Sequence, residues 1–433
     1  MNRSIRAAVG ALFCIACAAH AQGADAWKFA FGPGKAPAGY TPVAADAVYS
    51  ATRGYGLGPD SRPDGAQPWY FSVDVPEGNF TVTVTLGDDR AAGTTTVKSE
   101  LRRLMLENVR TGPGDTVTKT FTVNVRMPQI APVAGVAAGA VKLKAPRETD
   151  EEGWNWDARL TLEINGTHPA VRTIAIERAQ VPTLFLLGDS TVCDQPAEPY
   201  NSWGQMLPRF FKPGIAVANH GESGETYRDS LARRRLDKIL SVMTPGDTVV
   251  MQFGHNDQKQ IKEGKGGPFT TYKAEIKAHV DAVRAHGGLP VIVAPMERRG
   301  FDADGHVIPS LQEYAEAARQ SAQELNVPFI DLNTMSKTLY EALGPEGSKA
   351  AFAEPAPGRL DNTHHDNYGS YELAKAVVLG LRAARVPAAA FVADDFAFDP
   401  AHPDPVAAFS VPPSPRRTSQ RPLGDEAHRE VRQ

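Results

Sequence analysis

The chain has 433 residues, which is long enough for two or three domains with a hydrophobic core each. Apolar residues make up 42% of the sequence and charged residues 22%, so a wholly disordered chain is excluded. The formal net charge is -4, so no basic field attracts nucleic acid, and we expect no nucleic-acid partner.

Residues 1–21 are typical of a bacterial export signal. Basic residues precede an apolar stretch at residues 7–19, and Ala19-His20-Ala21 is a typical cleavage site. The apolar stretch is too short to span a bilayer. We expect cleavage after this site and a secreted or periplasmic protein with no membrane span after cleavage. A retained anchor and a lipid-modified Cys17 are the alternatives.

The cysteines argue against an internal disulfide. Cys14 and Cys17 lie in the export signal, which leaves Cys193 alone in the mature chain. Cys193 lies three residues after Ser190, so a thiol nucleophile is one interpretation. We favour a small buried hydrophobe, because no glycine-flanked turn presents this thiol.

Residues 27–180 are predicted to form antiparallel strands. Apolar and polar residues alternate in segments rich in Thr and Val, and Gly, Pro and Asp separate these segments. The clearest segments are residues 68–75, 80–86, 119–125 and 158–164. This pattern predicts a β-sandwich of the jelly-roll type. We expect its aromatic residues to pack in the core or between domains, with sugar stacking as the alternative. They include Trp69, Tyr70, Trp154 and Trp156.

Residues 182–385 alternate short apolar strands with helical segments. Strands are predicted at 183–187, 215–219, 248–253, 290–294 and 328–332, and helices at 201–211, 271–286, 311–325 and 368–384. This alternation predicts a parallel sheet with helices on both faces, which is an α/β domain. Residues 386–433 become rich in proline, and we expect a tail that is partly disordered or lies along the surface.

The motif Gly188-Asp189-Ser190 follows the first predicted strand of the α/β region. Gly188 lets the chain turn tightly and leaves Ser190 at the carboxyl edge of the sheet, where ligands bind in open α/β sheets. A serine after Gly-Asp is also a common cap of a turn or helix. The motif alone leaves a nucleophile and a capping residue as alternatives.

Three more motifs fall at the ends of later elements. Asn219-His220-Gly221-Glu222-Ser223-Gly224 follows the second strand, and Gln252-Phe253-Gly254-His255-Asn256-Asp257 follows the third. Asp361-x-x-His364 precedes the last helix, and an aspartate at this spacing can hydrogen-bond the histidine Nδ1. Each motif alone is explained by a capped loop. Together, and in this order, they favour one shared site.

The four motifs resemble the four blocks of the SGNH, or GDSL, hydrolase family: Gly188-Asp189-Ser190, Gly221, Gly254-His255-Asn256-Asp257 and Asp361-x-x-His364. The Gly-Asp-Ser-Thr and Phe-Gly-His-Asn-Asp forms are similar to those of rhamnogalacturonan acetylesterases. Residues 31–34, 39–40 and 53–56 resemble the β-domain of larger bacterial members. The resemblance implies a flavodoxin-like α/β domain preceded by a galactose-binding-like sandwich.

By this resemblance the chain is a serine esterase. Ser190 attacks an ester carbonyl, His364 takes its proton, and Asp361 orients His364. The backbone N–H groups of Ser190 and Gly221 and the side-chain amide of Asn256 form the oxyanion hole. The resemblance implies an acetylated pectic polysaccharide, rhamnogalacturonan, or an oligosaccharide of it as substrate. It implies neither a metal nor an organic cofactor.

His365 lies next to the predicted catalytic histidine. The rings of His364 and His365 cannot occupy the same place, so we expect His365 at the rim of the site or in solvent. A metal site built from these two residues with Asp189 and Asp366 is an alternative. We disfavour it because no helical spacing such as His-x-x-x-His is present.

Arg298 and Arg299 are candidates for substrate binding, because they would attract the uronate carboxylates of a pectin backbone. Ordinary solvated loop charge is the alternative. Two other functions also stay open: an esterase, lipase or thioesterase acting on another acyl ester, and a carbohydrate-binding protein without catalysis. The four intact motifs favour catalysis, and the β-domain with the export signal favours a polysaccharide substrate.

Overall fold

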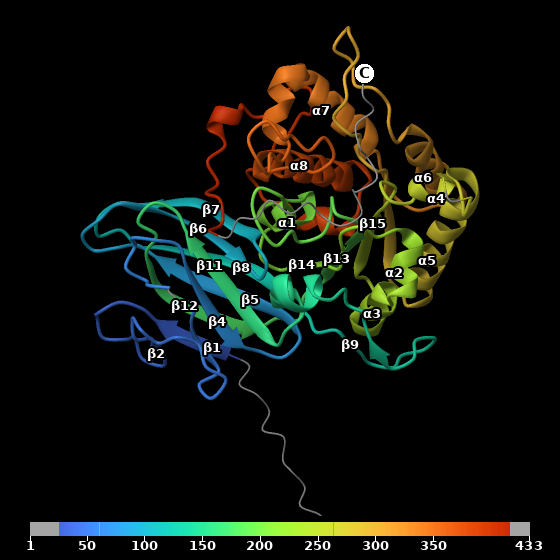
Figure 1. The fold of residues 1–433 in the computed structure, drawn as a ribbon. Coiled ribbons are helices and arrows are strands. Elements are labelled where there is room, and N and C mark those ends of the chain that lie inside the picture. The colour runs from blue at the N-terminus through green and yellow to red at the C-terminus, as the bar shows by residue number, and fades with distance from the viewer. Residues whose placement is uncertain (1–25, 60, 263, 416–433) are drawn as a thin grey trace, which may run out of the picture.

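A computed structural model describes residues 26–415 except 60 and 263, so the expected export signal lies outside the described residues. The first half is antiparallel except for the parallel pair of β1 (Ala26–Ala30) and β2 (Thr41–Pro42), and the second half is a parallel sheet between helices (Figure 1). The expected class, a β-sandwich followed by an α/β domain, is confirmed. No helix among the described residues is long and apolar enough to cross a membrane.

Two five-stranded sheets form the sandwich, in the orders β2-β1-β12-β5-β8 and β3-β4-β11-β6-β7. Their strands are β1 (Ala26–Ala30), β2 (Thr41–Pro42), β3 (Tyr55–Leu57), β4 (Trp69–Asp74), β5 (Gly78–Leu86), β6 (Gly93–Ser99), β7 (Arg103–Thr111), β8 (Val117–Val125), β11 (Arg159–Asn165) and β12 (Val171–Arg178). Buried and partly exposed residues alternate along β4, and Trp69 is fully buried in the core between the sheets. β9 (Gln129–Ile130) and β10 (Gly139–Ala140) form a separate two-stranded ribbon.

The parallel sheet has the order β14-β13-β15-β16-β17. Its strands are β13 (Thr183–Gly188), β14 (Ala216–Asn219), β15 (Thr248–Gln252), β16 (Leu289–Val293) and β17 (Phe329–Ile330). Every residue of β13 is buried, as expected for a central strand with both faces covered. Leu184 and Leu186 pack into one core and Phe185 and Leu187 into the other, because alternate side chains of a strand point to opposite faces.

Helices cover the two faces of the parallel sheet. α1 (Trp203–Met206), α7 (Leu332–Gly347) and α8 (Asn367–Ala383) contribute to the first core, and α2 (Tyr227–Ala232), α3 (Arg235–Val242), α5 (Lys273–Ala285) and α6 (Gln312–Leu325) to the second. A short helix, α4 (Lys259–Lys262), follows β15. The helix expected at 201–211 is shorter: α1 gives way to a 3-10 turn that contains Pro208, whose ring cannot continue the α-helical hydrogen bonds.

The chain after α8 packs against both halves of the protein. Val386 and Val392 are buried in the first core, and the Tyr368 hydroxyl donates to the carbonyl of Asp404 at 2.7 Å. Near residue 415, the Lys98 ammonium of β6 donates to the Ser414 hydroxyl at 2.8 Å. The tail therefore lies along the surface as far as it is described, and residues 416–433 lie outside the described part.

His365 lies in the core, so its expected place at the rim of the site was wrong. It is 2% exposed, its Nε2 lies 2.7 Å from the Tyr340 hydroxyl, and its ring centroid lies 4.3 Å from that of Phe352. Successive side chains of extended backbone point to opposite sides, so His364 and His365 enter different environments. Burial, assisted by the charge of His364, lowers the pKa of His365 to about 3.

The low pKa of His365 predicts a loss of stability in mild acid. In the unfolded chain this ring has a pKa of about 6.5, so unfolding takes up a proton as the pH falls from 7 towards 3. This histidine should lower the free energy of unfolding by about 2 kcal/mol between pH 7 and pH 5. In His365→Gln, urea titrations at the two pH values should show a pH dependence smaller by that amount. Parallel pH dependences in the two proteins would contradict the assignment.

Glycine is required at position 188 because there is no space for a side chain. Backbone conformation is not the reason, since the φ of Gly188 lies outside the left-handed region. A Cβ at this position would meet the side chain of Val192 and would lie 2.6 Å from the backbone oxygen of Gln252. Gly188→Ala should therefore lower the free energy of unfolding by about 1–3 kcal/mol in a urea titration. Gly34→Ala is the matched control, because its Cβ would meet nothing within 4 Å. Equal stability of the two variants would contradict the argument.

Candidate active site

The three predicted catalytic side chains meet at the carboxyl end of β13. The Ser190 hydroxyl oxygen lies 2.8 Å from His364 Nε2, and His364 Nδ1 lies 3.1 Å from Asp361 Oδ2. Ser190 follows the strand directly, whereas the other two residues lie in the loop before α8. All three are at most 3% exposed. The structure therefore brings together one hydroxyl, one imidazole and one carboxylate in the order that nucleophilic catalysis requires.

The loop around Asp361 holds its carboxylate ionised. Oδ1 accepts the backbone N–H groups of Thr363 at 2.9 Å and His364 at 3.0 Å. Burial alone would raise the pKa of Asp361, but the charge of His364 and these hydrogen bonds outweigh it and lower the pKa. The backbone of Ala353 pairs with both Asp361 and His364, which fixes the loop against the chain before it.

The predicted oxyanion donors follow three neighbouring strands, β13, β14 and β15. In the described part of the chain, no group accepts a hydrogen bond from the Ser190 N–H. The Gly221 N–H donates to Asn219 Oδ1 at 3.1 Å, and Asn256 Nδ2 donates to the carbonyl of Glu225 at 3.1 Å. The sequence did not indicate these two partners. They hold the two donors in place at the sheet edge before any substrate arrives.

A second aspartate–histidine pair supports the turn that carries Ser190. His255 Nδ1 lies 3.4 Å from Asp189 Oδ2, and Asp189 Oδ1 accepts the N–H and the hydroxyl of Thr191. Burial would raise the pKa of Asp189, but the charge of His255 and the hydrogen bonds lower it overall. This pair joins the first and third sequence motifs directly.

Arg298 and Arg299 both bind other parts of the chain. Arg298 donates to Gln258 Oε1 at 3.1 Å and to the carbonyl of His255 at 3.3 Å. Arg299 donates from its backbone to the Asn362 carbonyl at 2.8 Å and from its side chain to Asn362 Oδ1 at 3.1 Å. The two partly exposed guanidinium groups therefore brace loops of the site.

Cys193 is a buried thiol, 1% exposed, as expected. Its Sγ lies 3.4 Å from the Ser223 hydroxyl, and burial, followed by the charges of Glu222 and Glu152, raises its pKa well above the ordinary value. A thiol that stays protonated is a poor nucleophile.

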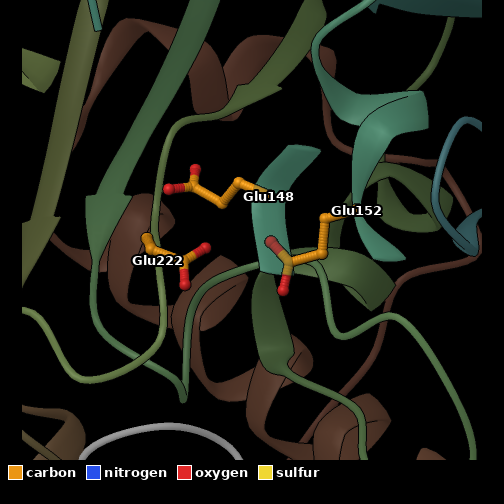
Figure 2. A group of neighbouring side chains, drawn as sticks. All are labelled: Glu148, Glu152 and Glu222. Carbon is orange, nitrogen blue, oxygen red and sulfur yellow. The ribbon is translucent and has the colours of Figure 1, made fainter. Parts of the chain in front are cut away.

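The alternative metal site of adjacent histidines is not formed, because His365 points to Tyr340 and Asp189 to Thr191. Within the described ranges, one other acidic group has metal-like spacing: oxygens of Glu148, Glu152 and Glu222 lie within 4.8 Å of one another (Figure 2).

These three carboxylates already face cations of the chain. Arg235 forms two hydrogen bonds with Glu148, at 2.9 and 2.7 Å. Arg147 Nε lies 2.5 Å from Glu152 and 3.2 Å from Glu222. Burial and the neighbouring Glu222 also raise the pKa of Glu152 well above its ordinary value. The group is therefore a buried salt-bridge network beside the site.

Comparisons with known proteins show which family the chain resembles. A model described as the GDSL-like Lipase/Acylhydrolase family matches residues 186–365. The rhamnogalacturonan acetylesterase RhgT of Bacillus subtilis is 39% identical over 214 residues, which are 47% of this chain and 91% of the relative. The uncharacterized esterase YxiM of the same organism is 25% identical over 389 residues, which are 82% of this chain and 90% of the relative.

The crystal structure of YxiM has a TM-score of 0.47 at 24% identity and covers 84% of this chain and 99% of that chain. The family assignment depends on the more similar relative, which is matched over 91% of its length at 39% identity. This chain belongs to the GDSL-like lipase/acylhydrolase family, the SGNH hydrolases, and is a serine esterase.

Proposed function

We propose that this esterase removes acetyl groups from rhamnogalacturonan, a pectic polysaccharide, through an acyl-enzyme formed on Ser190. The observation that carries the proposal is the hydrogen-bonded series from Ser190 through His364 to Asp361, at 2.8 and 3.1 Å. The substrate class is supported by the relative at 39% identity, which is named a rhamnogalacturonan acetylesterase. The expected export signal at residues 1–21 fits an enzyme that meets polysaccharide outside the cytoplasm.

The hydrogen-bond partners determine which nitrogen of His364 acts as the base. An ionised Asp361 only accepts hydrogen bonds, so Nδ1 carries the proton and Nε2 presents its lone pair to Ser190. His364 takes the hydroxyl proton as Ser190 attacks the acetyl carbonyl, and returns it to the sugar oxygen that leaves. Water, activated by the same histidine, then releases acetate.

The negative charge of the tetrahedral intermediate requires donors that are already in position. The Ser190 N–H is available, and an amide nitrogen has two hydrogens, so Asn256 keeps one for the oxyanion when the other binds Glu225. The Gly221 N–H has to share its proton between Asn219 and the oxyanion, in a bifurcated bond.

The enclosure of the nucleophile favours a small acyl group. Ser190 is 3% exposed and His364 2%, and the Tyr200 ring lies edge-on to the His364 ring at 6.0 Å between centroids. A short acetyl group needs less room at such a site than a long acyl chain. The sugar part of the substrate then has to approach from the carboxyl edge of the sheet.

The proposal predicts acetate release from acetylated rhamnogalacturonan by the mature protein. Acetylated xylan should be the poorer substrate, and a small aryl acetate should report the chemistry alone. Ser190→Ala should lower kcat by at least about 10³-fold on every substrate, because the nucleophile is lost. The exposed Ser410→Ala is the matched control and should retain full activity.

Three outcomes of this experiment separate chemistry from substrate. Full activity of Ser190→Ala would contradict the acyl-enzyme mechanism. Hydrolysis of the aryl acetate without any release from rhamnogalacturonan would contradict the substrate and keep the mechanism. No activity of the wild-type protein on any of the three esters would contradict both.

Asn256→Ala should lower kcat by about 10²–10³-fold and change KM little, because the oxyanion forms only after substrate is bound. Steady-state kinetics on the aryl acetate measure both constants. Gln258→Ala is a control on the same loop, outside the proposed oxyanion hole. A loss confined to KM in Asn256→Ala would show that its amide binds ground-state substrate instead.

A further inference from the structure

The turn between β6 and β7 carries part of the β-domain into the α/β domain. Leu101, Arg102 and Arg103 are at most 4% exposed, and the Leu101 carbonyl accepts Gln205 Nε2 of α1 at 2.8 Å. Glu100 and Arg102 have φ values of 51° and 64°, in the left-handed region that side chains disfavour. Such strain persists only where surrounding contacts determine the backbone, and it is frequent at functional sites.

Arg103 anchors the loop that follows the nucleophile. Its Nε lies 2.7 Å from Asp194 Oδ2, and its other nitrogens donate to the Asn124 carbonyl and Asn155 Oδ1, each at 3.1 Å. Arg103 and Asp194 are each 2% exposed. A buried carboxylate without a partner is costly, and Arg103 is the nearer of two cations that face Asp194, the other being Arg126 at 4.0 Å.

Asp194 and the Val192 carbonyl together orient the Asn219 amide. Asp194 Oδ1 accepts Asn219 Nδ2 at 2.9 Å and the Val192 carbonyl accepts it at 2.6 Å, so the amide oxygen faces the other way, where it accepts the Gly221 N–H at 3.1 Å. An ionised carboxylate only accepts, so a flipped amide would set oxygen against oxygen and its NH₂ against the Gly221 N–H. The contacts therefore run without a gap from Arg103 to Gly221.

Arg102 supports the opposite side of the site. It pairs with Glu198 at 2.7 Å and donates to Asn367 Oδ1 at 3.3 Å, three residues after His364. Asn201 also donates to Asn367, at 2.7 Å, and its N–H bonds the carbonyl of His365 at 2.9 Å. The same turn of the β-domain thus contacts the loop after the nucleophile and the segment after the histidine.

We propose that Arg103 is a positioning residue for ester hydrolysis: through Asp194 and Asn219 it fixes the Gly221 N–H in the oxyanion hole, so the β-domain completes the active site. The inference rests on the proposed function, since it concerns the donors of the same reaction. A misplacement of about 1 Å at a reacting group can cost about 10²-fold in rate. Loss of this positioning should lower kcat rather than raise KM, because the oxyanion is absent from the ground state.

Arg103→Met in the full chain should lower kcat on a small aryl acetate by about 10- to 100-fold and leave KM within about twofold. Arg103→Lys loses the contacts to Asn124 and Asn155 but keeps a cation beside Asp194. Because that cation is the nearer of the two that hold Asp194, this variant should retain most of the wild-type kcat. Arg110→Met, on an exposed position of β7, is the matched control and should behave as wild type. Thermal unfolding of each variant is measured beside the kinetics.

Double variants test whether Arg103 affects kcat through Asn219. If Arg103 acts through Asn219, then Arg103→Met should add little to the loss of kcat caused by Asn219→Ala. Arg103→Met should, in contrast, multiply the loss of kcat caused by Asn256→Ala, because the Asn256 amide lies outside this series of contacts. Should Arg103→Met not fold, Asn219→Ala is the second variant, because it removes the link without unpairing a charge.

Two results would overturn the inference. One is a folded Arg103→Met, or Asn219→Ala, with the kcat of wild type; the other is losses that multiply when the two changes are combined. Ser190→Ala, assayed beside them, separates this failure from that of the proposed function. If Ser190→Ala keeps full activity, the acyl-enzyme mechanism fails, whereas an inactive Ser190→Ala beside a fully active Arg103→Met rejects the positioning role alone.

Discussion

The constraint on which the site depends is the parallel register of β14, β13 and β15. The carboxyl ends of parallel strands lie at the same edge of the sheet. The segments that follow these strands therefore meet there, although they are far apart in sequence. Ser190 follows the central strand of the three, and the Asn219–Gly221 turn and the loop of Asn256 follow its two neighbours. The loop before α8 brings His364, the proposed base, to this edge from 174 residues away, together with Asp361. A change in the register of one of these strands relative to its neighbours would separate Ser190 from the predicted oxyanion donors.

Around this edge the protein buries several charges beside a charge of opposite sign. Burying a lone ion costs several kcal/mol, so each such group requires a partner in the same place. Arg103 with Asp194, Arg102 with Glu198, and Arg235 with Glu148 all meet this requirement across segments that are distant in sequence. The first two pairs join the β-domain to the α/β domain. The walls of the site are therefore held by electrostatic pairing that neither domain supplies alone.

The sequence was sufficient to predict the fold class and the meeting of Ser190, Asp361 and His364, because local patterns carry both. Alternation of apolar and polar residues predicts a strand, and a short motif that follows the strand places a side chain at the end of it. The side on which His365 lies depends on Tyr340 and Phe352, which no local pattern connects to it. The same holds for Arg103 and Asp194, 91 residues apart, and for the contact that makes Gly188 necessary. Pairings that form only after folding leave no periodic signal in the chain.

The burial of His365 also bears on the chemistry of its neighbour. With a pKa lowered to about 3 this ring stays neutral at ordinary pH, so it places no positive charge beside His364. In the proposed mechanism, the imidazolium that forms when His364 takes the Ser190 proton is therefore opposed by no like charge from His365, and the Asp361 carboxylate stabilises it directly. A second charged histidine in that position would make the proton harder to accept and the nucleophile harder to activate. The hydroxyl of Tyr340 and the ring of Phe352, by enclosing His365, thus leave His364 as the histidine that faces Ser190 and as the proposed base.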